Sequence, residues 1–272
     1  MPADAVDQGF LGRKRAAVIR KIKRALGIHF SSKALARNPN ICLRQYARRF
    51  RSFGDLARDL TDRQKVTIVQ VGANDGSAND PLGRMIAAHP ERIARALLIE
   101  PQTDAFGRLS GRYAGQAHIT CLNAAIDRTA GERPVYSIDK DAVEARIGQR
   151  MSDGIASFDR SHVASVLRAN TDGLTDAEID ELITSEVVAV TTLAAASAEV
   201  GTDQPDILLV DTEGFDAEIM RMALEAGWRP ALLQYEHKHL SPQDRREISS
   251  RLMAEGYRLW ADHADVWGQR AS

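Results

Sequence analysis

The 272-residue sequence lacks the features that mark secreted, membrane-spanning or zinc-binding proteins. It has only two cysteines, Cys42 and Cys121, which excludes a disulfide framework and a zinc site of the CxxC type. We expect both to be small buried hydrophobic residues. No apolar run approaches the roughly 18 residues of a membrane-spanning helix. The first ten residues, MPADAVDQGF, lack the order of a secretory signal, so we expect a cytoplasmic protein.

Two common nucleotide-binding motifs are also absent. Without a GK[ST] sequence, a P-loop that cradles phosphates is not expected. Without GxGxxG, the fingerprint of dinucleotide-binding domains is incomplete. Any nucleotide-like ligand would therefore have to be held by a different glycine turn.

The net charge of −1 hides an uneven distribution of charge. Residues 1–51 carry 13 Lys and Arg but only two Asp, whereas the remainder carries 23 basic and 35 acidic residues. The basic stretch RKRAAVIRKIKR, residues 13–24, fits peripheral contact with an anionic membrane surface. It also fits contact with nucleic acid that does not depend on the nucleotide sequence. It equally fits a helix that packs its apolar face on the acidic main domain.

From residue 66 onward, apolar runs of strand length alternate with helical patterns. This alternation predicts a mostly parallel sheet flanked by helices. The first run, VTIVQV, is rich in β-branched residues and is typical of a strand buried on both faces. Strands are expected at residues 66–71, 94–101, 118–127, 206–214 and 230–239, followed by a closing hairpin in YRLWADHADVW.

A long insertion at about residues 133–190 interrupts this alternation. It contains SDGIASFDRSHV and the helical pattern LTDAEIDELI. Ligands of open α/β sheets bind beyond the carboxyl ends of the strands, so the insertion could cover an acceptor there. It could also be only an outer helical layer. Ser157, Phe158 and His162 are the candidates for contact with an acceptor.

The segment VGANDG follows the first expected strand and forms an unusual turn. Gly72 and Gly76 lack a Cβ, and Asn74 tolerates a left-handed backbone, so a ligand can approach the main chain closely. Glu100 stands at the tip of the second strand, where an acid can accept hydrogen bonds from both hydroxyls of a ribose.

Taken in order, VGANDG, LLIEP, NAAID, LLVDTEGFDAEI and YEH resemble the FkbM-type S-adenosylmethionine-dependent methyltransferases. The resemblance covers about residues 64–267, and DTEGFD is its most specific part. It implies a class I methyltransferase fold: a Rossmann-like α/β sheet of seven strands, mostly parallel, with the last strand antiparallel and helices on its flanks. Residues 1–63 would then be a basic helical extension and residues 64–272 the methyltransferase domain.

The resemblance also assigns cofactor contacts by position. The glycine turn would surround the methionine and ribose of S-adenosylmethionine, and the ends of the second and third strands would border the ribose and adenine. Two positions depart from the common pattern: Gln70 replaces a frequent aspartate and Thr212 a β-branched apolar residue. The cofactor-binding residues expected on this basis are Gly72, Asn74, Asp75, Gly76, Glu100, Pro101, Gln102, Asn123, Ala124 and Asp211.

The implied reaction is methyl transfer to a hydroxyl of a carbohydrate, glycan or glycosylated metabolite. A neutral hydroxyl must lose its proton as it attacks, so a positioned base is expected. The candidate catalytic residues are Asp211, Glu213, Glu236 and His237, with His239 as an alternative to His237.

Two alternatives concern individual residues of this set. Glu213 also fits a cap of the helix that begins near Phe215 rather than a catalyst. Asp211 and Glu236 could begin a Mg²⁺ site, but the sequence supplies no third or fourth ligand, and we expect no metal.

Two other functions stay open at this point. A glycine turn with an acid on the second strand also suits a nicotinamide-dependent oxidoreductase. A non-catalytic binding protein could keep the fold and dock through its basic residues 1–51.

Overall fold

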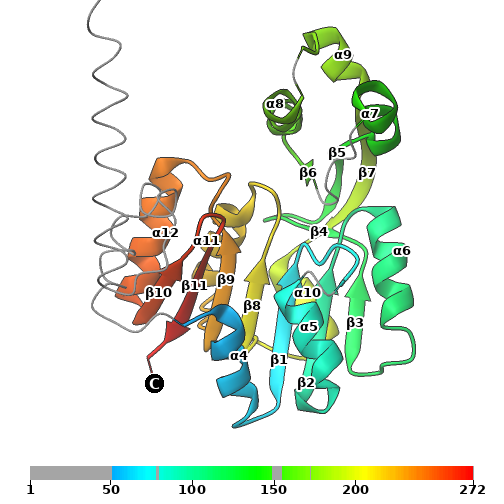
Figure 1. The fold of residues 1–272 in the computed structure, drawn as a ribbon. Helices are drawn as coiled ribbons and strands as arrows, with labels where there is room; N and C mark the ends of the chain where they lie inside the picture. Colours follow the sequence, from blue (N-terminus) through cyan, green and yellow to red (C-terminus); the bar gives the residue numbers. More distant parts are fainter. Residues whose placement is uncertain (1–50, 78–79, 149–154, 172, 272) are drawn as a thin grey trace, which may run out of the picture.

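The computed structural model describes residues 51–77, 80–148, 155–171 and 173–271 (Figure 1). The basic helix expected at residues 13–24, and Cys42, lie outside these residues. Cys121 is half-buried and packs against the hydrophobic core, so the expectation of full burial is only partly met. Within the described ranges, the helices are too short or too polar to cross a membrane.

A seven-stranded sheet forms the centre of the molecule, in the order β10-β11-β9-β8-β1-β2-β3. β11 runs antiparallel to the other six strands of this sheet, as the resemblance implies. The carboxyl ends of β1, β2 and β8 therefore meet at one edge of the sheet. The strands are β1 (Val66–Val71), β2 (Ile93–Ile99), β3 (Ile119–Leu122), β8 (Ile207–Val210), β9 (Leu232–Glu236), β10 (Tyr257–Ala261) and β11 (Asp265–Arg270).

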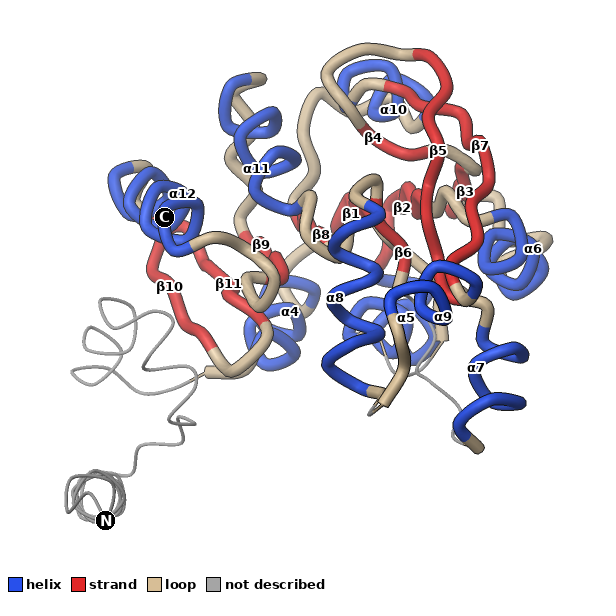
Figure 2. Tube along the Cα trace, turned by 90° about the horizontal axis from the view of Figure 1, so that it is seen from above, coloured by secondary structure: helices blue, strands red, loops and turns tan. Residues whose placement is uncertain are grey.

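Helices cover both faces of this sheet, as Figure 2 shows from above. Alternation along β1 explains why: Ile68 packs into one hydrophobic cluster with α4, α5 and α6, whereas Val69 packs into another with α10, α11 and α12. The prediction of a strand buried on both faces is confirmed. The helices are α4 (Phe53–Thr61), α5 (Pro81–Ala88), α6 (Thr103–Arg112), α10 (Leu193–Glu199), α11 (Asp216–Glu225) and α12 (Pro242–Ala254), with the short 3-10 helix η1 (Pro90–Arg92) before β2.

Asp80 and Pro81 mark the start of α5. The side chain of Asp80 accepts hydrogen bonds from the backbone N–H groups of Leu82 and Gly83, and Pro81 occupies the first helical turn. These two residues explain why α5 begins directly after the glycine turn.

Together with residues 125–132, the insertion folds as a second, four-stranded sheet in the order β4-β7-β5-β6, topped by three helices (Figure 1). Its helices enclose a small core of their own around Val143, Val163 and Leu167. The single strand expected at 118–127 is wrong, because its first half belongs to the main sheet and its second half to this one. The elements are β4 (Ala125–Ile126), β5 (Gly131–Ile138), α7 (Lys140–Ile147), β6 (Ala156–Ser157), α8 (Arg160–Asn170), α9 (Asp176–Glu181) and β7 (Ile183–Thr191).

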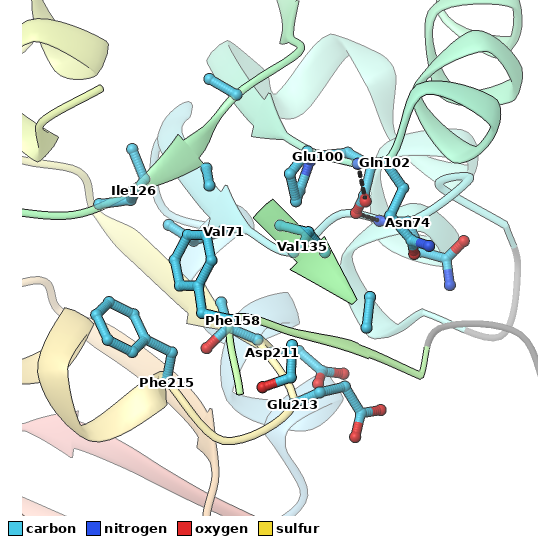
Figure 3. Close-up of a pocket in the computed structure, with 17 residues that line it drawn as sticks. Val71, Asn74, Glu100, Gln102, Ile126, Val135, Phe158, Asp211, Glu213 and Phe215 are labelled. Carbon is cyan, nitrogen blue, oxygen red and sulfur yellow. Dashed lines mark hydrogen bonds between the residues drawn. The ribbon is translucent and has the colours of Figure 1, made fainter. Parts of the chain in front are cut away.

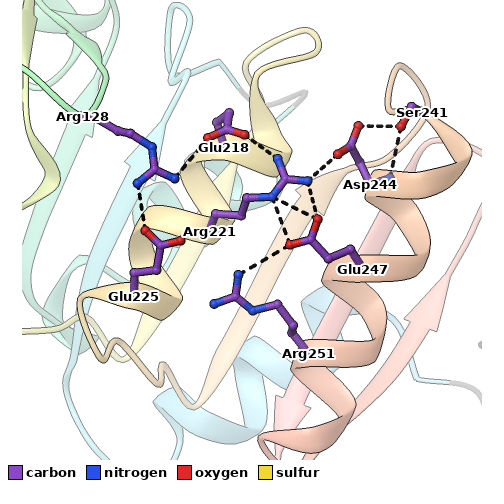
Figure 4. A network of polar contacts seen from close by, with 8 residues as sticks. All are labelled: Arg128, Glu218, Arg221, Glu225, Ser241, Asp244, Glu247 and Arg251. Carbon is purple, nitrogen blue, oxygen red and sulfur yellow. Dashed lines mark hydrogen bonds and ion pairs between the residues drawn. The ribbon is translucent and has the colours of Figure 1, made fainter.

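An ionic network joins α11 to α12 (Figure 4). The half-buried Arg221 guanidinium donates two hydrogen bonds to Glu247, at 3.1 Å from Nε and 2.6 Å from Nη2, and also contacts Glu218 and Asp244. These bonds, those to Glu247 above all, raise the pKa of Arg221, which stays charged. Because the planar guanidinium of Arg221 contacts three carboxylates at once, it fixes the relative position of the two helices more firmly than an isolated ion pair on the surface would.

Candidate active site

A pocket lies where the carboxyl ends of β1, β2 and β8 meet the underside of the second sheet (Figure 3). The main sheet supplies most of its polar residues and the second sheet most of its apolar ones. Because β5, β6 and the residue after β6 contribute to it, the insertion covers this site and is more than an outer helical layer. The lining residues are Val71, Gly72, Asn74, Glu100, Pro101, Gln102, Ala124, Ala125, Ile126, Val135, Ala156, Ser157, Phe158, Asp211, Thr212, Glu213 and Phe215.

The glycine turn after β1 lets two strands approach closely at the pocket. Gly72 has a φ of 82°, and a Cβ at this position would lie 1.7 Å from the carbonyl oxygen of Asp211. Asn74 also adopts a left-handed conformation, with a φ of 48°. Gly72 is therefore required by the packing of β1 against the end of β8, and the same turn exposes main-chain atoms to the pocket.

The carboxylate of Glu100 is held by two backbone amides. Oε2 accepts a hydrogen bond from Asn74 N at 2.8 Å and Oε1 accepts one from Gln102 N at 2.9 Å. The residue is only 5% exposed, and this burial raises the pKa of Glu100. The hydrogen bonds from the two backbone amides lower the pKa and so act in the opposite direction. Each carboxylate oxygen has a second lone pair, so Glu100 can still accept hydrogen bonds from a ligand.

Three residues expected to bind the cofactor do not line the pocket. Asp75 Oδ1 accepts a hydrogen bond from Ser77 N at 2.9 Å and so stabilises the turn. Gly76 packs against α6, where a Cβ would lie 2.8 Å from both Leu109 and Tyr113.

The third of these residues, Asn123, supports the pocket from outside. Its Nδ2 donates to the carbonyl oxygens of Glu100 at 2.9 Å and Pro101 at 3.0 Å. It therefore fixes the turn that follows β2, whereas the neighbouring Ala124 does line the pocket. The structure brings the other expected cofactor residues, from Gly72 through Asp211, to one cavity.

Asp211, Glu213 and Glu236 form a carboxylate cluster at the ends of β8 and β9, with one oxygen of each within 4.8 Å of the others. Burial, followed by the charge of Glu213, raises the pKa of Glu236 to about 7. The side chain of Asp211 is open to the pocket, yet protein atoms surround its carboxylate. This burial, followed by the charge of Asp216, raises the pKa of Asp211 well above its ordinary value. Crowded carboxylates of this kind attract a proton or a cation.

The structure distinguishes between the two candidate histidines. His237 is fully buried beneath the β10–β11 turn, with its Nε2 3.3 Å from the carbonyl oxygen of Asp262, and it does not line the pocket. His239 Nε2 lies 3.2 Å from Glu213 Oε2 and 3.6 Å from Glu236 Oε2. Neither histidine nor Glu236 lines the pocket, but His239 lies against the carboxylate cluster and His237 does not.

Glu213 does not cap α11, so that alternative is wrong. Phe215, the N-cap residue of α11, makes no side-chain capping bond. Asp216, a residue that the sequence reasoning missed, instead holds the loop that precedes the helix: its Oδ2 accepts from Thr212 N and Gly214 N, both at 3.3 Å. Glu213 instead has a φ of 50°, an uncommon conformation for a residue with a side chain, and this places its carboxylate next to His239.

The insertion contributes aromatic and imidazole groups to this region. Phe158 contacts Phe215 edge to face, with ring centroids 5.4 Å apart, and the guanidinium of Arg133 lies 4.0 Å from the centroid of Phe158. The His162 ring packs edge to face on His239 at 4.5 Å. Ser157 and Phe158 line the pocket, and His162 lies beside the carboxylate cluster.

A neighbouring acid gives a testable pH dependence of stability. Burial, followed by the charges of Asp262, Glu236 and Asp216, raises the pKa of Asp265 to about 8, whereas Lys238 acts in the opposite direction. The unfolded chain has a reference pKa of about 3.9, so the folded state binds more protons between the two values and stability falls as pH rises from about 4 to about 8. We expect Asp265→Asn to be more stable than the wild type at pH 9 by about 1 kcal/mol or more.

Urea unfolding at pH 5, 7 and 9 measures this effect. Asp104→Asn, the same change on the exposed first turn of α6, serves as the control and should follow the wild type. Parallel pH profiles for Asp265→Asn and the wild type would contradict the expectation.

A comparison with known families assigns this fold to one of them. Residues 70–262 match the family described as methyltransferase FkbM domain. The chain belongs to the FkbM methyltransferase family. The resemblance drawn from the five strand-end segments is thereby confirmed. Comparison with proteins of curated function gives no match.

Solved structures similar to this FkbM methyltransferase share little sequence with it. Methyltransferase FkbM from Methylobacillus flagellatus KT has 12% identity and a TM-score of 0.47, over 93% of this chain and 60% of that one. The SAH-bound methyltransferase PaMTH1 from Podospora anserina has 8% identity and a TM-score of 0.41, over 94% of this chain and 96% of that one. The chain thus spans about three fifths of the length of the Methylobacillus protein.

Proposed function

We propose that this methyltransferase transfers the methyl group of S-adenosylmethionine to a hydroxyl of a carbohydrate or another hydroxylated small molecule. The observation that carries the proposal is the carboxylate of Glu100, which two backbone amides hold in the same cavity that Asp211 lines. Among solved structures similar to this chain, fibrillarin from Aeropyrum pernix contains natively bound S-adenosylmethionine.

The residues of the pocket fit this cofactor. Glu100 retains acceptor capacity for two ribose hydroxyls, as an acid at the tip of a second strand does in other nucleotide-binding sheets. Pro101, Ala124 and Ile126 offer an apolar surface for the adenine. The negative charges of the carboxylate cluster suit the positive sulfonium of the cofactor.

The cofactor supplies a methyl group on a positively charged sulfur, and the chain supplies positioning and a proton acceptor. Transfer is an in-line displacement, so holding the hydroxyl oxygen in line with the methyl group lowers the barrier most. Asp211 lines the cavity on the side away from Glu100 (Figure 3) and is placed to take the hydroxyl proton. A base in such a position contributes about 10²- to 10⁴-fold in rate.

The second sheet supports an acceptor of small molecular size. Ser157 and Phe158 face the pocket from above, opposite the end of β8. Together with Phe215 they combine aromatic faces and a hydroxyl, which are groups that contact the two faces and the edges of a sugar ring. A flat polymer surface would be excluded by this cover.

Calorimetric titration with S-adenosylhomocysteine tests the cofactor assignment. We expect Glu100→Ala to weaken binding by about 1 to 3 kcal/mol, because two ligand hydroxyls lose their acceptors. Glu132→Ala, at an exposed position of β5, is the matched control and should bind as the wild type does. Folded protein that shows no binding at millimolar ligand would overturn the proposal.

Methyl transfer from isotopically labelled S-adenosylmethionine to a panel of acceptors tests the substrate class. We expect label in mono- and oligosaccharides with free hydroxyls and none in their fully acetylated forms. Transfer only to amine or protein acceptors would contradict O-methylation but leave the cofactor assignment intact.

A further inference from the structure

We propose that His162, Glu213 and His239 bind a divalent transition-metal ion beside the methyl-transfer pocket. Each residue offers one ligand atom, and the three atoms lie within 4.8 Å of one another. They come from distant segments: His162 from α8 of the insertion, Glu213 from the loop after β8, and His239 from the loop after β9. From the sequence, only Asp211 and Glu236 were candidates for the start of a metal site. The structure adds the imidazoles of His162 and His239, which lie close to Glu213.

The spacing of the ligand atoms fits a metal centre. Ligands about 2.0 to 2.2 Å from a tetrahedral ion lie about 3.3 Å from each other. His239 Nε2 lies 3.2 Å from Glu213 Oε2, and the ligand atom of His162 lies within 4.8 Å of the ligand atoms of both, so small side-chain adjustments bring the three to bonding distance of one ion. Glu236 belongs to the neighbouring carboxylate cluster with Asp211 and Glu213.

Unsatisfied polar atoms provide an independent observation. His162 Nε2, His239 Nε2 and Glu236 Oε2 are all buried and none of them makes a hydrogen bond. Glu236 itself is 7% exposed, and its unpartnered oxygen faces His239. Buried polar atoms without hydrogen bonds are rare because each costs free energy, and one cation held by His162, Glu213 and His239 would give both imidazoles a partner.

The donor set selects the class of ion. Two imidazole nitrogens with one carboxylate suit Zn²⁺, Co²⁺, Fe²⁺ or Mn²⁺, whereas Mg²⁺ and Ca²⁺ prefer oxygen ligands alone. Glu213 belongs both to this site and to the carboxylate cluster with Asp211, which lines the pocket. An ion held here would therefore face the acceptor side of the cavity and could bind an acceptor hydroxyl, a role that rests on the proposed function.

Metal titration of the full chain tests the site. The protein is treated with EDTA, exchanged into metal-free buffer, and titrated separately with Zn²⁺, Co²⁺ and Mg²⁺. We expect one Zn²⁺ or Co²⁺ per chain, visible absorption bands for bound Co²⁺, and Mg²⁺ binding at least about 10-fold weaker. His162→Ala and His239→Ala should each weaken Zn²⁺ binding by at least about 10-fold.

Two further variants make the outcome specific. His162→Gln keeps a side chain of similar length without the imidazole, and is used should the alanine variant fail to fold. His89→Ala, a half-exposed histidine at the end of α5, is the control and should bind Zn²⁺ as the wild type does. Absence of Zn²⁺ and Co²⁺ binding by folded protein, or binding that all the variants retain, would overturn the proposal.

The metal site and the proposed function can fail separately. Glu100→Ala should weaken S-adenosylhomocysteine binding and leave Co²⁺ absorption unchanged, while His162→Gln should do the reverse. Protein that binds Co²⁺ but not S-adenosylhomocysteine would refute the proposed function and retain the metal site.

Discussion

Gly72→Ala is expected to lower the free energy of unfolding by about 3 kcal/mol or more. The added methyl group would lie 1.7 Å from the carbonyl oxygen of Asp211 and 2.7 Å from its carbonyl carbon, so the backbone of β1 or of the loop after β8 must move. A φ of 82° adds strain for any residue with a Cβ. Since Gly72 and Asp211 both line the pocket, binding of S-adenosylhomocysteine should be lost along with stability.

Urea unfolding and calorimetric titration measure both effects. Gly107→Ala is the matched control, because Gly107 lies within α6 and an added Cβ would meet nothing within 4 Å. Alanine favours a helix over glycine, so this variant should gain about 0.5 to 1 kcal/mol. A Gly72→Ala protein as stable as the wild type would show that β1 and the end of β8 do not approach as described.

The sequence predicts the part of the pocket that parallel sheet geometry determines. Gly72, Glu100 and Asp211 each follow an apolar run of strand length, and the carboxyl ends of parallel neighbours share an edge. Their convergence in one cavity therefore follows from strand order alone. The resemblance to the FkbM family supplied that order.

The second sheet could not be predicted in the same way. β5 pairs with β7 from Gly131 opposite Val190 to Ile138 opposite Ile183, so the paired residues lie 45 or more positions apart in the sequence. Local periodicity carries no information on such a partner. The break between β3 and β4 was missed for a related reason: Asn123 turns the chain by bonding to the carbonyl oxygens after β2, a contact set by tertiary structure.

The sequence also could not show which of His237 and His239 lies near the carboxylate cluster. Alternation assigns faces only within a strand, and β9 ends at Glu236. Beyond it, His237 N and Lys238 N both donate to the carbonyl oxygen of Ala264, which turns His237 into the core. His239 is then directed toward Glu213. The two imidazoles near the cluster, His162 and His239, are brought together by the same long-range folding.

Asp216 shows how one buried acid can organise a site without lining it. It is fully buried, and its Oδ2 accepts from the Thr212 hydroxyl at 2.9 Å while its Oδ1 accepts from Glu236 N at 3.1 Å. It thus connects the loop after β8 to the end of β9, the two segments that carry the carboxylate cluster. Thr212, the departure from the family pattern, adds one of these hydrogen bonds.

Asp216→Ala is expected to lower the free energy of unfolding by about 3 to 5 kcal/mol, because buried amides and a hydroxyl lose their acceptor. The loop from Asp211 to Gly214 would lose its attachment to β9, so methyl transfer should fall further than S-adenosylhomocysteine binding, which depends on Glu100. Glu225→Ala, on the exposed last turn of the same helix, should change little beyond its ion pair with Arg128. Urea unfolding, ligand titration and transfer of labelled methyl groups separate these effects. An Asp216→Ala protein that keeps both stability and transfer would mean that the position of the carboxylate cluster does not depend on this residue.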